Sequence, residues 1–103
     1  MPNSSQHKDY YEAILQIRPR DKEVEDYVER RIKNRPEVKV PKRIVKKFGI
    51  DIYLNSKHFA REIIKKLRKA FDGEVKMSSQ VHKVDRWTSK VLTRLTICFR
   101  RKG

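Results

Sequence analysis

Residues 50–77 read IDIYLNSKHFAREIIKKLRKAFDGEVKM, and this stretch decides the fold. Apolar and polar residues alternate over residues 50–54, a period of two that predicts a β-strand. Asn55 and Ser56 are suited to cap a helix, and apolar residues recur at helical spacing over residues 57–71. An Asp-Gly pair then breaks the helix, and alternation resumes after it. The stretch therefore predicts a strand, a helix and another strand in succession.

The expected helix at residues 57–71 separates into two faces when successive residues are turned by about 100 degrees around its axis. The apolar face consists of Phe59, Ala60, Ile63, Ile64, Leu67, Ala70 and Phe71. The other face contains one acid, Glu62, and six cations that we call the basic ridge: Lys57, Arg61, Lys65, Lys66, Arg68 and Lys69. Neighbouring cations repel one another unless a polyanion neutralises them, so the basic ridge predicts phosphate contacts. The alternative interpretation is an ordinary solvated face.

Toward the N-terminus, residues 11–18 alternate as a half-buried strand that Pro19 ends, although Ile14 breaks the polar face. The expected buried face of this strand is Tyr11, Ala13, Leu15 and Ile17. Asp21 is placed to cap a helix that stops before Pro36, with Glu29 and Lys33 spaced as an ion pair. Residues 35–49 combine two prolines with six cations, which leaves open a loop or a loop with an edge strand.

Toward the C-terminus, the sequence predicts an antiparallel hairpin. Val75, Met77 and Val81 alternate with polar residues, and a polar turn follows at residues 85–89. The last strand places Val91, Leu95, Ile97 and Phe99 on its core face. We therefore predict an α+β two-layer sandwich, a mainly antiparallel sheet with two helices on one face in the order β-α-β-α-β-β. Residues 1–9 are expected to be a flexible tail, and residues 10–103 one domain.

The charge of the chain is concentrated in its second part. The 103 residues include 27 Lys and Arg against 13 Asp and Glu, a formal charge of +14. Residues 1–34 hold 7 basic and 7 acidic residues, so the whole excess lies in residues 35–103, which hold 20 and 6. Such a field attracts polyanions. The lone Cys98 forms no internal disulfide, and no apolar run is long enough for a membrane span, so we expect a cytoplasmic protein with no membrane partner.

Further candidate contacts lie in the C-terminal hairpin. Cations on the outer sheet face are candidates to contact RNA. Tyr53 would stack on a base if its ring is exposed on that face, and is otherwise a packing residue. Trp87 stands in the polar turn, where it would either stack on a base or fold back over the sheet edge. Beyond the basic ridge, the predicted nucleic-acid contacts are Lys76, Arg86, Trp87, Lys90, Arg94 and Arg100.

Catalytic motifs are missing from the sequence. His7, His58 and His82 fall in different segments, and no HExxH, GxSxG, CxxC or glycine-loop spacing is found. Three scattered carboxylates would hold magnesium only if they met in space, and strand and cap positions explain two of them more simply: Asp51, Asp72 and Asp85. We therefore expect no enzyme activity, cofactor, metal or small-molecule substrate.

Three segments resemble the middle domain of the Nmd-three family, the export adaptors of the large ribosomal subunit and their archaeal relatives. They are YYEAILQIR at Tyr10–Arg18, IDIYLNSKHFAREI at Ile50–Ile63 and GEVKMSSQVHKVDRWTSKVLTRLTICFR at Gly73–Arg100. The most specific piece is D-R-x-T-x-K-x-x-x-R-x-T, matched by Asp85, Arg86, Thr88, Lys90, Arg94 and Thr96.

The resemblance implies association with the large ribosomal subunit, through ribosomal RNA and proteins, during late maturation or transport. The family normally carries paired CxxC zinc ribbons before this region, and the chain has none, so it is expected to be an excised domain or a short paralogue. The leucine-rich export signals are also missing, and export-adaptor activity does not carry over to this chain. The leading hypothesis is a non-catalytic RNA-binding or ribosome-binding domain, and the alternative is a module that docks an acidic ribosomal protein or biogenesis factor.

Overall fold

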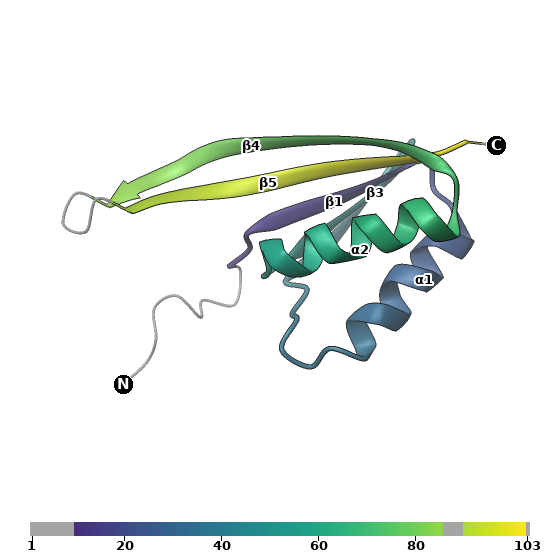
Figure 1. Ribbon diagram of the computed structural model, residues 1–103, viewed down its shortest axis with the longest axis horizontal. Coiled ribbons are helices and arrows are strands. Elements are labelled where there is room, and N and C mark those ends of the chain that lie inside the picture. The colour runs from purple at the N-terminus through teal and green to yellow at the C-terminus, as the bar shows by residue number, and fades with distance from the viewer. Residues whose placement is uncertain (1–9, 86–89, 103) are drawn as a thin grey trace.

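The computed structural model describes residues 10–85 and 90–102 as a mixed sheet covered on one face by two helices (Figure 1). The elements in chain order are β1 (Ala13–Arg18), α1 (Lys22–Lys33), β2 (Lys42–Lys46), β3 (Gly49–Leu54), α2 (Lys57–Ala70), β4 (Gly73–Asp85) and β5 (Lys90–Arg101). The strand order is β2-β3-β1-β5-β4, and every neighbouring pair is antiparallel except β1 and β5. The predicted α+β two-layer class, with a mainly antiparallel sheet, is confirmed.

The open question at residues 35–49 is answered by β2, an edge strand that pairs with β3. The observed order is therefore β-α-β-β-α-β-β, one strand more than the expected order. Lys46 pairs with Gly49 across a two-residue turn. A Cβ at Gly49 would approach the backbone oxygen of Ile17 to 2.3 Å, so the close approach of these two strands requires glycine at this position. Four of the five β2 residues are exposed, which is why their pattern was weak.

The core lies between the sheet and α2, as the helical periodicity predicted. The α2 side chains that are buried there are Phe59, Ala60, Ile63, Ile64 and Leu67. They face buried residues of the three central strands, Ala13, Leu15, Ile17, Ile50, Ile52, Leu54, Leu95, Ile97 and Phe99. Two residues at the end of the expected apolar face differ. Ala70 is exposed, and Phe71 is half-buried in an extended C-cap against the Tyr27 ring, with centroids 5.7 Å apart.

Tyr11 does not belong to the buried face of β1, and that expectation was wrong. A bend at Glu12 separates Tyr11 from the strand and interrupts the alternation. The Tyr11 ring instead packs edge-on against Tyr53, with centroids 4.8 Å apart. Tyr53 pairs in register with Ile14, so Tyr11 lies on the outer sheet face, away from the helices.

The expected C-terminal hairpin is confirmed as β4 and β5, which run past the helices at one end (Figure 1). Met77 pairs with the buried Ile97 and shares its sheet face, as the alternation predicted. Because β4 is an edge strand, Met77 is nevertheless 56% exposed, and Val81 is 63% exposed. A register shift between Val81 and Lys83 interrupts the ladder.

The predicted cap of α1 is confirmed. One Asp21 carboxylate oxygen accepts hydrogen bonds from the backbone N–H groups of Glu23 and Val24, at 3.0 and 3.2 Å. The other accepts from the Arg101 guanidinium at 3.1 Å, which ties α1 to β5. Glu29 forms its ion pair with Arg43 of β2, at 2.6 Å.

Asp21→Ala is expected to lower the free energy of unfolding by about 1 kcal/mol at neutral pH, because α1 loses its cap. Burial alone would raise the pKa of Asp21, but the hydrogen bonds from Val24 and Arg101 outweigh it and lower the pKa. A pKa that is lower in the folded state stabilises the fold above the unfolded pKa, and this contribution disappears as the pH falls through the folded pKa. Urea unfolding should therefore show a difference from wild type that shrinks as the pH falls below the pKa of an unperturbed aspartate, about 3.9. A constant difference at acidic pH, or an equal effect of Asp26→Ala on the exposed side of α1, would refute this role.

Candidate nucleic-acid interface

The basic ridge lies on the face of α2 that points away from the sheet. Ser56 begins the helix, with its Oγ accepting a hydrogen bond from Phe59 N at 3.1 Å. Glu12 fixes the same end, because its Oε1 accepts from Lys57 N at 2.9 Å. With the apolar side chains of α2 held against the sheet, Lys57 is half-buried and the other five cations of the ridge are exposed. The amphipathic pattern therefore presents these cations to solvent, as predicted.

The cations of the basic ridge form no ion pairs among the described residues. Among the side chains that the structure describes, none of the six approaches a carboxylate oxygen within 4.0 Å. Lys57 Nζ donates to the neutral Thr93 hydroxyl of β5 at 3.1 Å. Some arginines elsewhere are paired, for example Arg20 with Glu25 at 2.8 Å. The ion pairs of the described residues thus include none of the ridge cations, and the ridge keeps its charge.

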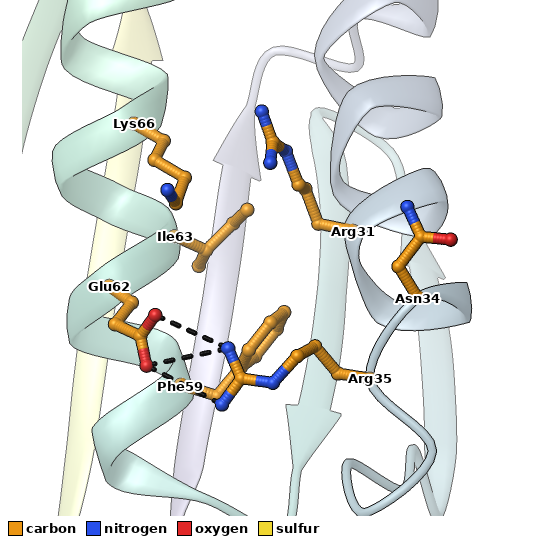
Figure 2. A pocket seen from close by; sticks show the side chains of 7 residues that line it. All are labelled: Arg31, Asn34, Arg35, Phe59, Glu62, Ile63 and Lys66. Atoms are coloured by element: carbon orange, nitrogen blue, oxygen red, sulfur yellow. Dashed lines mark hydrogen bonds and ion pairs between the residues drawn. The ribbon is translucent and has the colours of Figure 1, made fainter.

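Lys66 differs from the rest of the ridge because it is on the side of α2 that faces α1. There it lines a pocket of about 130 Å³, the α1–α2 pocket, shown in Figure 2. The other residues that line the pocket are Arg31, Asn34, Arg35, Phe59, Glu62 and Ile63. Two elements therefore contribute cations to one small cavity.

Glu62, the one acid on the polar face of α2, is held by Arg35 and His58. Its carboxylate accepts from Arg35 NH1 at 3.2 Å and lies 2.9 Å from His58 Nε2. The hydrogen bond from Arg35 lowers the pKa of Glu62. Arg35 also donates to Glu37 at 2.6 Å, and its guanidinium lies 5.5 Å from the centroid of the Phe59 ring. Glu62 thus links α2 to the segment after α1 through its ion pair with Arg35.

The predicted contacts on β4 and β5 lie on the opposite face of the molecule. Lys76 pairs in register with Cys98, and Arg94 and Arg100 occupy alternate positions of β5 on the same face. This outer face is the one without helices, so it does not form one surface with the basic ridge (Figure 1). The structure therefore divides the predicted contacts between two sides.

The aromatic rings of the outer face are covered by cations of the chain itself. Arg94 donates to the Tyr11 hydroxyl at 3.0 Å, with its guanidinium carbon 3.9 Å from the ring centroid. Lys42 Nζ lies 4.5 Å from the centroid of the half-buried Tyr53 ring. The geometry favours the packing interpretation of Tyr53, because a stacked base would have to displace Lys42.

Several predicted residues lie outside what the structure describes. Arg86 and Trp87 belong to residues 86–89, and the side chain of Lys90 at the start of β5 is also outside the described part. Their roles stay predictions. Asp51 is 2% exposed and pairs with Arg18 and Lys46, which explains its position on the strand. The described residues contain no group of three or more His, Cys, Asp or Glu side chains arranged to hold a metal ion.

Sequence reasoning missed Arg31 and Arg35, which α1 and the segment after it bring to the α1–α2 pocket. The available signal was the basic last turn of α1, which contains Arg30, Arg31 and Lys33. Cations are common there because they interact favourably with the C-terminal carbonyl groups of a helix. Only the placement of α1 beside α2 distinguishes Arg31 from its neighbours.

The fold and the charge distribution define a basic two-layer α+β domain. The chain belongs to the NMD3 family: the model of the NMD3 second domain matches residues 10–100, which confirms the resemblance seen in the sequence. The search of curated proteins gave no match. The NMD3 family is a non-catalytic export-adaptor family that associates with the large ribosomal subunit in the nucleus and cytoplasm. Within the described residues, no helix combines the length and apolarity that crossing a bilayer requires.

Proposed function

We propose that this chain binds RNA of the large ribosomal subunit through the basic ridge, in the cytoplasm and without catalysing a reaction. The single observation that carries the proposal is that the described part of the chain provides no carboxylate within 4.0 Å of any ridge cation. A phosphate backbone supplies the missing counter-charge and releases its own bound ions. Membership in the NMD3 family supports the large subunit as the source of that RNA.

The length of the ridge suits a run of several phosphates. From Lys57 to Lys69 the helix rises by about 18 Å, at about 1.5 Å per residue. Four of the six cations are exposed on this side, Arg61, Lys65, Arg68 and Lys69, whereas Lys57 is half-buried and Lys66 faces α1. Binding through charge and backbone shape, with little reading of bases, is the mode that such a helix supports.

The salt dependence of affinity tests this mode of binding. With about five phosphates of a duplex contacted, the logarithm of the association constant should fall with the logarithm of salt concentration at a slope near −4.5. Fluorescence anisotropy with a labelled RNA hairpin, titrated at several salt concentrations, measures the slope. If the affinity for RNA does not change as the salt concentration is raised, the proposal is refuted.

A second candidate function is docking of an acidic ribosomal protein or biogenesis factor. Exposed apolar side chains favour it, because Phe48 is 70% exposed at the β2–β3 turn and Val45 beside it is 60% exposed. Capture of partners by the tagged chain, with and without nuclease, separates the two functions. A protein retained after nuclease treatment and at high salt would favour docking over RNA binding.

A further inference from the structure

The α1–α2 pocket is lined by two cations, Arg31 and Lys66, that form no ion pair among the described residues. Arg31 extends from the last turn of α1 and Lys66 from α2, and both point into the gap between the helices near Ile63 (Figure 2). Ile63 is 1% exposed and closes the base of the pocket with an apolar surface. Both side chains therefore lie beside an apolar surface that offers them no polar partner.

The third cation of the pocket is not available in the same way. Arg35 is held by Glu37 and Glu62, so its charge is balanced within the chain. Arg31, by contrast, donates to the neutral Tyr27 hydroxyl at 3.1 Å. Among the described side chains, no carboxylate lies within 4.0 Å of Arg31 or Lys66. The open part of the pocket is therefore positive, although Glu62 lines it.

The size of the pocket limits what it can hold. A volume of about 130 Å³ is far below the roughly 300 Å³ at which sites for whole small molecules begin. A single compact anionic group fits this space, whereas a nucleobase or a cofactor does not.

We propose that the α1–α2 pocket binds one phosphate group of an RNA backbone, with Arg31 and Lys66 as its cations. The proposal rests on RNA binding by the basic ridge and extends that interface from α2 onto α1. Lys66 belongs to both, so a strand that follows the ridge can place one phosphate between the helices. A guanidinium opposite an ammonium group supplies both directional hydrogen bonds and charge to such a group.

The ordinary role of Arg31, interaction with the carbonyl end of α1, provides a matched control. Arg30 and Lys33 stand in the same last turn, where a cation has the same favourable interaction with the helix C-terminus. Arg30 is exposed and lies on the other side of α1, beside Glu23 and Asp26. Arg30→Gln and Arg31→Gln therefore remove the same charge from the same turn, and only Arg31→Gln changes the pocket.

The test titrates inorganic phosphate into the ¹⁵N-labelled full chain and follows amide chemical shifts in wild type, Arg31→Gln, Lys66→Gln and Arg30→Gln. Phosphate should shift resonances of α1 and α2 around the pocket, and each pocket variant should weaken binding by about tenfold while Arg30→Gln leaves it near wild type. A short duplex RNA should compete with phosphate for these resonances. A glutamate-rich peptide should compete much less at equal charge.

Three results would overturn the proposal: no phosphate shifts at the pocket, equal losses in Arg30→Gln and Arg31→Gln, or competition by the peptide and not by RNA. The salt titration of wild type with the RNA hairpin separates this failure from failure of the proposed function. If RNA affinity falls steeply with salt but phosphate shifts no resonance at the pocket, RNA binding by the ridge is supported and phosphate binding in the pocket is refuted. If the chain binds no RNA, the proposed function of the ridge is refuted. The phosphate titration still shows whether the pocket binds an anion.

Discussion

Replacing Arg61, Lys65 and Arg68 together with Glu is expected to lower the affinity for duplex RNA by about 100-fold or more. Each exposed contact between a cation and a phosphate is worth about 1 kcal/mol in water, so three lost contacts alone account for that factor. The three new carboxylates also repel the backbone. All three residues are exposed on α2, so the variant should keep its circular dichroism spectrum and thermal midpoint.

A matched variant separates the location of the charge from its amount. Lys22, Lys33 and Lys47 are exposed and lie on α1 or in the β2–β3 turn, away from the ridge. Their replacement with Glu changes the net charge by the same amount. Anisotropy titrations at one salt concentration should show a far smaller loss for this variant. Equal losses would mean that net charge alone drives RNA binding, and that the ridge is not the interface.

Phe99→Ala is expected to lower the free energy of unfolding by about 3–5 kcal/mol, a large part of the stability of a small domain. Phe99 is 0% exposed on β5 and pairs in register with Ile17 on one side and Val75 on the other. Its ring also lies against Gly73, where an added Cβ would approach it to 2.8 Å. Truncation would therefore leave a cavity where three strands meet.

Met77→Ala is the control for this substitution, because Met77 lies on the same sheet face but is 56% exposed. It should cost less than about 1 kcal/mol, since little apolar surface leaves water there on folding. Urea unfolding followed by circular dichroism measures both variants. Comparable losses for the two would contradict the placement of the core between β5 and the helices.

The parts of the fold that were predictable are those where one face of an element is buried. The alternation of Ile50, Ile52 and Leu54 and the helical spacing of α2 both result from packing against the same core. The second strand was not predictable, because β2 is an edge strand whose residues are mostly exposed. Tyr11 was placed on the wrong face because one bend at Glu12 reverses the alternation, and no local pattern indicates that bend.

The candidate site also has one part that could be predicted from the sequence and one that could not. The basic ridge was predictable because it is the polar face of one amphipathic helix, so its residues are neighbours through local geometry alone. The α1–α2 pocket was not, because Arg31 and Lys66 meet only through the placement of two helices. The basic ridge and the outer sheet face both carry cations, and sequence alternation does not show that Arg94 on the outer face is bound to Tyr11.

Co-sedimentation with purified ribosomal subunits tests directly whether the chain binds the large subunit through α2. At physiological ionic strength the wild-type chain should pellet with large subunits and much less with small subunits, and higher salt should release it. The Arg61, Lys65 and Arg68 to Glu variant should stay in the supernatant, while the variant with three scattered lysines replaced should still pellet. Equal pelleting of the ridge variant and the wild type with large subunits would contradict binding through α2.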